Sequence, residues 1–294
     1  MPPKRSHAEM SATGDEPSAL DSCPQGEQLM AIIQRENKVI EICVGGNDTR
    51  SGSILLLREK LHSVCPSGRR PTYRQGGVDG IPKVVLSRSH CLEVLGLFVQ
   101  WLYTGKYNEL NGPVKSLDRG IQTPLLDMCE SYGKDTMEWT VKAAVLAWSM
   151  GKELQVPSFQ NYAMKRLFAA FSRPSERPLL TPALYEYVKK LEFRLYLGDM
   201  AFRSEWKDKG PLERALGVTI IRNWGDKAIV DQEELESWSD LFRSCDAFRD
   251  KFLEGSLLSL EERREKTLMA EDYFVAVPKS RTVPKSSLVI TRKD

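Results

Sequence analysis

The stretches that decide the fold read LFVQWLYTGKY at Leu97–Tyr107 and AAVLAWSMGKELQVPSFQNYAMKRLF at Ala143–Phe168. In the first, apolar residues recur at helical spacing until Thr104-Gly105, where glycine can adopt the left-handed conformation that ends a helix. In the second, an apolar helix meets Val156-Pro157, and proline forces one helix to stop and another to start. The helices predicted here span Cys91–Tyr103, Val141–Leu154 and Ser158–Phe171.

Short apolar runs upstream predict a small sheet. Val39–Val44 alternates like a strand and is followed by the turn residues Gly45-Gly46-Asn47-Asp48, so Ser53–Leu57 is expected to be the returning strand. A helix is expected at Arg58–Val64 and a third strand at Lys83–Leu86. These strands and helices together predict an α+β fold.

The composition along the chain divides it into four parts. Residues 1–26 are rich in Ser, Pro, Gly and charge, so we expect disorder there. Residues 27–172 form the predicted α+β domain, which contains a long loop at 108–140. A mostly α-helical region follows at 173–262, with helices expected at Pro182–Ala201 and Asp231–Leu253 and with Asp231 as an N-cap. Residues 263–294 are expected to be a flexible basic tail.

Composition and charge exclude several classes of protein. The 294 residues carry a formal net charge of only +2, so no global field attracts nucleic acid or an anionic membrane. No apolar run approaches the roughly 20 residues that a membrane-spanning helix needs. The N-terminus has no apolar core and does not read as a secretory signal. We therefore expect a cytoplasmic or nuclear protein, or one found in both compartments.

No arrangement of residues predicts catalysis or a cofactor. The six cysteines and three histidines are scattered and contain no CxxC pair, so no metal site is predicted. His90 and Cys91 are adjacent on a predicted helix, where neighbouring side chains point about 100° apart and cannot easily share a proton. The carboxylate pairs Glu233-Glu234 and Glu261-Glu262 lie in charged helical stretches, which favours solvent-exposed faces. The sequence predicts no enzyme, no cofactor and no small-molecule substrate.

The apolar framework resembles the BTB/POZ domain, particularly the stand-alone type of filamentous fungi with a helical C-terminal extension. The resemblance covers roughly residues 28–171. The residues that carry it are Val84-Val85-Leu86, Phe98, Trp101-Leu102-Tyr103-Thr104-Gly105, Leu146, Gly151-Lys152, Leu154, Val156-Pro157, Gln160-Asn161 and Met164. It implies a small mixed sheet capped by helices and a function in binding other proteins.

The resemblance also suggests where partners bind. It places a partner-facing surface at the exit of the helix that ends at Thr104-Gly105, and aromatic residues are common anchors of protein interfaces. The residues predicted at this partner interface are Tyr103, Tyr107, Gln100 and Lys106. The residues predicted for self-association are Leu29, Ile32 and Ile33, in a short helix expected at Gln28–Gln34.

The leading hypothesis is a non-enzymatic protein–protein interaction module that binds a partner protein or a second copy of itself. One alternative, which the resemblance allows, is a substrate adaptor that binds a cullin in a ubiquitin ligase. Another is a nuclear or transcriptional regulatory protein, suggested by Lys4-Arg5 and the basic residues after Val277. No aromatic residue interleaves with that basic tail from Val277 onward, so specific nucleic-acid binding is not expected.

Overall fold

The computed structural model describes residues 39–44, 52–65, 81–86, 90–109, 111–116, 129–133, 135–195, 205–265 and 267–278. The predicted N-terminal disorder lies outside the described residues. So does the short helix at Gln28–Gln34, with Leu29, Ile32 and Ile33.

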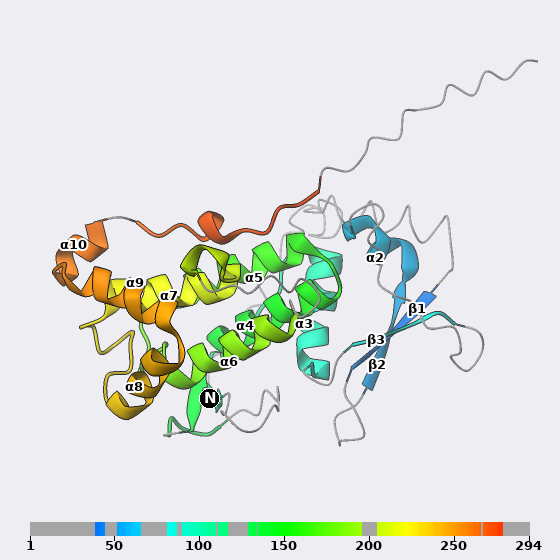
Figure 1. Ribbon diagram of the computed structural model, residues 1–294. Coiled ribbons are helices and arrows are strands. Elements are labelled where there is room, and N and C mark those ends of the chain that lie inside the picture. The colour runs from blue at the N-terminus through cyan, green and yellow to red at the C-terminus, as the bar shows by residue number, and fades with distance from the viewer. Residues whose placement is uncertain are drawn as a thin grey trace, which may run out of the picture.

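A three-stranded mixed sheet forms one end of the molecule (Figure 1). Strand β1 (Val39–Val44) lies between β2 (Gly52–Leu57), which is antiparallel to it, and β3 (Lys83–Val85), which is parallel. Helix α2 (Arg58–Val64) follows β2 directly. The α+β class and the sheet-forming segments predicted from the sequence are confirmed, with the third strand one residue shorter than expected.

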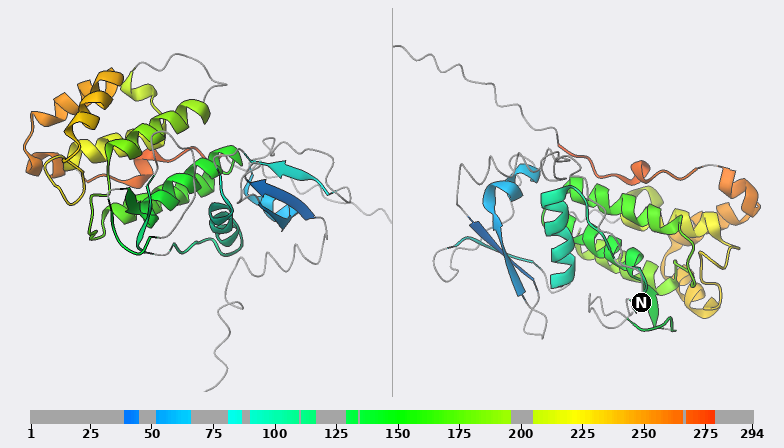
Figure 2. Two further views of the ribbon diagram at one scale, coloured as in Figure 1. Left: turned by 90° about the horizontal axis from the view of Figure 1, so that it is seen from below. Right: turned by 180° about the vertical axis from the view of Figure 1, so that it is seen from behind.

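The sheet buries one face against helix α3 (Leu92–Thr104), which lies between the sheet and the remaining helices (Figures 1 and 2). Alternate residues of the strands point inward, as the period of a half-buried strand requires. The buried residues of that face are Ile40, Ile42, Val44, Leu56 and Val84. Helix α3 ends as predicted, because Gly105 adopts φ 75° and its N–H donates to Trp101 O.

The centre of the core is the pair α4 (Trp139–Glu153) and α5 (Pro157–Phe171). Nearly every residue of α4 is buried, so this helix is covered on all sides. The predicted break between the two helices is confirmed: Gln155 takes a left-handed φ of 57°, and Pro157 occupies the first turn of α5, where its missing N–H costs no hydrogen bond.

The long loop predicted at 108–140 is only partly correct. Two short strands within it, β4 (Pro113–Lys115) and β5 (Thr136–Glu138), pair antiparallel. The ammonium of Lys142 in α4 donates to Lys115 O at 2.5 Å and ties this two-stranded ribbon to the core. Strands of three residues are too short to show an alternating pattern, so no periodicity in the sequence predicts them.

The C-terminal region is helical, as predicted, but its boundaries differ. Its elements are α6 (Pro182–Leu195), the 3₁₀ turn η2 (Trp206–Asp208), α7 (Pro211–Asn223), α8 (Leu235–Ser244), α9 (Asp246–Ser256), α10 (Leu260–Glu265) and the 3₁₀ turn η3 (Ala270–Tyr273). Helix α7 was not predicted. The single helix expected at Asp231–Leu253 is wrong, because Cys245 adopts a non-helical conformation, with φ −145° and ψ 82°, and divides the segment into α8 and α9.

The helix start expected at Asp231 is also wrong. The carboxylate of Asp231 accepts a hydrogen bond from Glu233 N at 2.9 Å, in a turn that precedes α8, and the helix begins only at Leu235. The helix predicted from Pro182 is described only as far as Leu195.

The flexible tail predicted at 263–294 needs a correction in its first part. Helix α10 extends to Glu265, and residues 267–278 run in a largely extended path across α5 and α7 (Figure 1). We call residues 267–278 the strap. Tyr273 of the strap is buried and packs on Phe168 of α5. Tertiary contact of this kind holds a segment whose composition alone predicts flexibility.

Candidate protein-interaction surfaces

The exit of α3 contains the four residues predicted to face a partner, and these residues differ in how far they are buried. Tyr107 is only 1% exposed and therefore cannot be a surface contact, which makes that assignment wrong. Its ring meets those of Tyr162 and Phe159 edge-on, with centroids 5.0 and 6.1 Å away, and its N–H donates to the Tyr162 hydroxyl at 3.3 Å. After Gly105 the chain turns back toward α5, and this turn carries Tyr107 into the core.

Tyr103 is partly buried and its hydroxyl accepts a hydrogen bond from Leu57 N at 3.4 Å, which joins α3 to the end of β2. Gln100 and Lys106 are exposed. The side-chain carbonyl of Gln100 already accepts from Asn108 N at 3.1 Å. The α3 exit therefore presents a small, polar, locally hydrogen-bonded surface without an aromatic anchor at Tyr107.

His90 and Cys91 are buried at the start of α3 and are not arranged as a nucleophile and its base. His90 is buried, and its Nε2 lies 2.9 Å from the Glu153 carboxylate at the end of α4. Burial raises the pKa of the Cys91 thiol to about 12, so the reactive thiolate is scarce at neutral pH. The contact between His90 and Glu153 fastens the start of α3 to the end of α4.

The C-terminal region contains two buried carboxylates, Glu192 and Glu213. Glu192 accepts hydrogen bonds from Leu212 N at 3.1 Å and from Glu213 N at 3.2 Å, so it satisfies the free N–H groups at the start of α7. Burial raises the pKa of Glu213, which accepts from the Tyr185 hydroxyl at 3.4 Å. Neither carboxylate lines the two cavities described below, and the role of Glu192 is structural.

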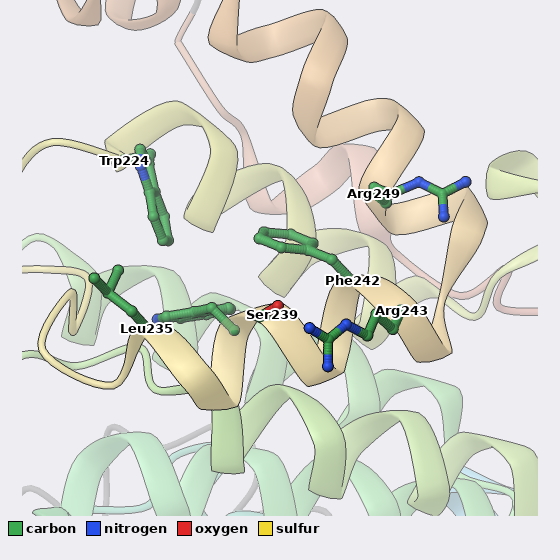
Figure 3. Close-up of a pocket in the computed structure, with 7 residues that line it drawn as sticks. Trp224, Leu235, Ser239, Phe242, Arg243 and Arg249 are labelled. Carbon is green, nitrogen blue, oxygen red and sulfur yellow. The ribbon is translucent and has the colours of Figure 1, made fainter.

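A surface cavity of about 290 Å³ lies on the C-terminal helices (Figure 3). Most of its lining comes from α8, with one residue from the end of α7 and one from α9. The lining residues, which we call the aromatic groove, are Trp224, Leu235, Trp238, Ser239, Phe242, Arg243 and Arg249. Figure 3 shows Trp224 and Leu235 at one end of the groove and the two arginines at the other.

The walls of the aromatic groove are fixed by ring contacts. Trp238 is buried, its indole N–H donates to Asp231 O at 2.6 Å, and its ring meets Trp224 edge-on at 5.4 Å. Phe242 packs on Phe252 of α9 at 4.7 Å. By contrast, the side chain of Leu235 is 64% exposed at the mouth of the groove. The groove is therefore preformed, with an apolar residue left in water beside it.

The arginines of the groove are already paired within the chain. Arg243 lies 3.4 Å from Asp240, and Arg249 lies 2.7 Å from Asp246 and 3.1 Å from Asp250. Exposed pairs of this kind contribute little to stability. The rim of the groove is consequently close to neutral, so its apolar lining decides what it can bind.

A second cavity, of about 700 Å³, lies between the β4–β5 ribbon and the α5–α6 connection. Its lining is mixed and polar, and includes Glu138, Tyr132 and Arg173. The Tyr132 hydroxyl bonds to the Glu138 carboxylate, which also accepts from Ser175 at 3.5 Å, so these groups satisfy one another. The lining of this cavity is therefore less uniformly apolar than that of the aromatic groove.

No protein-family model matches the chain, and searches of curated proteins and of solved structures found no match. Among the described residues, no cluster of His, Cys, Asp or Glu could hold a metal ion. Within the same part of the chain, every helix is too short or too polar to cross a membrane.

Proposed function

We propose that this chain is a non-enzymatic protein–protein interaction module of BTB/POZ type, which recruits a partner or associates with itself in the cytoplasm, the nucleus or both. The observation that carries the proposal is the aromatic groove, with exposed Leu235 at its mouth. Tryptophan and arginine are over-represented among the residues that dominate binding energy at protein interfaces. Preformed walls also reduce the entropy lost on binding.

The order of elements in the N-terminal half supports the BTB/POZ assignment. A hairpin, a helix, a parallel third strand, a further helix and then a helix pair follow one another in the chain. The segments that carry the resemblance occupy matching places: the WLYTG stretch ends α3 at Gly105, and Val156-Pro157 separates α4 from α5. This agreement favours a binding fold over a catalytic one.

The groove is suited to an apolar side chain from a partner helix or loop. Its wall consists mainly of the rings of Trp224, Trp238 and Phe242, and its arginines are engaged by neighbouring aspartates. Burial of one leucine side chain from water is worth about 1.5–3 kcal/mol. Because Leu235 is the exposed apolar residue of the groove, a partner that covers it would gain this hydrophobic free energy.

The test compares the wild-type chain with Leu235→Glu. Affinity capture with mass spectrometry would name partners, and analytical ultracentrifugation would measure self-association. We expect Leu235→Glu to weaken the specific complex or the self-association by about ten-fold or more, since it places a charge in an apolar contact.

Leu257→Glu is the matched control, because Leu257 is 86% exposed and lies outside the groove. This control variant should bind like the wild type. Equal binding by all three chains, or a wild-type chain that is monomeric and captures no specific partner, would contradict the proposal.

A further inference from the structure

The strap is bound like a peptide ligand on the surface of α5. Figures 1 and 2 show it leaving the end of the molecule that contains α10 and running back over α5 and α7 toward the end that contains the sheet. Beyond one turn of 3₁₀ helix at Ala270–Tyr273 it has no regular structure of its own. Its position therefore depends on its contacts with α5 and α7.

Three residues of α5, spaced by four and three positions, form one stripe of the helix surface beneath the strap. Phe168 stacks on Tyr273, with ring centroids 5.7 Å apart. Lys165 contacts both the Glu271 carboxylate, at 3.3 Å, and the ring of Phe274, at 5.3 Å. The third residue, Asn161, lies beside Val275, so the strap runs antiparallel to the helix.

Asn161 recognises the main chain of the strap. Its amide nitrogen donates to Val275 O at 2.9 Å, and its amide oxygen accepts from Val275 N at 2.8 Å. This pair of bonds imitates the way a neighbouring strand would bind an extended segment. Tyr273 supplies the side-chain anchor, since it is buried between α5 and α7. Main-chain hydrogen bonds beside a buried aromatic side chain are suited to binding an extended peptide.

The helix before the strap is anchored independently. Arg263 of α10 donates to Trp224 O at 2.7 Å, and Arg264 donates to Asn223 Oδ1 at 2.8 Å, so α10 is tied to the end of α7. Only residues 266–269 separate α10 from the first buried residue of the strap, Ala270. The strap can therefore leave its site while α10 stays bound to α7, and the short connection between them is the hinge that an exchange between copies requires.

We propose that the strap exchanges between two copies of this chain, with Ala270–Val275 of each copy seated on α5 of the other. The proposal rests on the self-association included in the proposed function. The occupant is a second copy, because every copy carries the segment that fits this site within its own chain. Reciprocal exchange creates a closed two-fold contact, and exchange of identical elements is a low-cost route to dimers.

The experiment uses two full-length variants, one carrying Lys165→Cys and the other Glu271→Cys. Lys165 lies on α5 and Glu271 lies on the strap, where they form an ion pair, and both side chains are about half exposed. The variants are mixed, treated with a short bismaleimide cross-linker and digested, and mass spectrometry searches for peptides that link positions 165 and 271. In this mixture such a link can form only between two chains, so we expect to find it.

Three controls make the result specific. A chain with both substitutions should link internally or between copies, which shows that the pair is reactive. Lys207→Cys, at an exposed lysine in η2, replaces Glu271→Cys to measure chance encounters, and it should give no link to position 165. Adding Tyr273→Ala to the Glu271→Cys chain should lower the yield of the interchain link by about ten-fold, because the anchor is lost.

A link in the doubly substituted chain but none in the mixture would overturn the exchange. The Leu235→Glu comparison is separate, since Leu235 lies in the aromatic groove and not under the strap. Loss of strap exchange with Leu235-dependent binding retained would remove only this inference, whereas loss of Leu235-dependent binding would remove the proposed function.

Discussion

Replacing Glu192 with alanine should destabilise the C-terminal helices by about 3 kcal/mol. The carboxylate is buried, with the residue only 2% exposed, and it accepts the N–H groups of Leu212 and Glu213 at the start of α7. A hydrogen bond to a charged group contributes about 1.5–3 kcal/mol. The helix dipole favours a negative charge at this end by up to about 2 kcal/mol. The desolvation cost of the buried carboxylate opposes these contributions. We therefore take about half of the sum of the two hydrogen bonds and the dipole interaction as the net loss of stability.

Gly210 provides an internal check on this account. A Cβ atom at Gly210 would lie 2.0 Å from the Glu192 carboxylate, so alanine there must displace the cap. The backbone of Gly210, at φ −64° and ψ 160°, is otherwise open to any residue. Gly210→Ala should therefore cost about 2 kcal/mol in the wild type, the usual size of an overpacking penalty. In the Glu192→Ala background it should instead stabilise the protein by about 0.5 kcal/mol, because alanine lowers the entropy of the unfolded chain.

The assay is urea unfolding followed by tryptophan fluorescence and far-UV circular dichroism for both single variants and the double variant. Glu205→Ala is the control, because its carboxylate is 63% exposed and its ion pair among the described residues is with Lys207 across the surface. It should change the free energy of unfolding by less than about 1 kcal/mol. Additive effects of Glu192→Ala and Gly210→Ala, or a change below about 1 kcal/mol for Glu192→Ala, would refute the capping argument.

Three further predictions follow from buried groups. The Tyr107 hydroxyl is buried and has no hydrogen-bond partner among the described residues, so Tyr107→Phe should raise the free energy of unfolding by up to about 1 kcal/mol; a loss measured by urea unfolding would contradict its assignment to the core. Because the pKa of Cys91 is about 12 instead of 9.0, its thiolate fraction is about a thousand-fold smaller, and peptide mapping should show alkylation by iodoacetamide only after unfolding. Burial raises the pKa of Glu213 above its ordinary value of 4.5, so the folded state binds this proton more tightly than the unfolded state, and the protein loses stability as the pH rises above about 4.5 and up to the folded-state pKa of Glu213. Over that interval the free energy of unfolding of Glu213→Gln, measured with urea, should rise relative to that of the wild type. If the two free energies changed with pH in parallel, the linkage would be disproved.

The elements that the sequence predicted well are those with local signals. The strand at Val39–Val44 and the helix at Arg58–Val64 have the predicted bounds, because alternating and helical spacing of apolar residues are properties of the segment itself. The end of α3 at Gly105 and the break before Pro157 were predictable for the same reason, since glycine and proline restrict the backbone wherever they occur.

The predictions that failed depended on contacts with distant residues. Nothing in the sequence near Cys245 marks the break between α8 and α9, because the apolar spacing continues across it. Tyr107 follows a helix end, where the sequence allows either a surface or a core position, and Tyr162 and Phe159 decide for the core. The aromatic groove is assembled from three helices, so no single segment could have indicated it.

By itself, the sequence determined the α+β class, the sheet-forming segments and the paired helices at the centre, because those depend on periodicity and on residues that constrain their own backbone. Only the tertiary structure decided which side chains remain at the surface and which distant segments meet. It buried Tyr107, left Leu235 in water beside Trp224 and Trp238, and seated the strap on Asn161. The physical reason is that spacing tells which face of an element is apolar, whereas the partner that covers this face is fixed only when the whole chain packs.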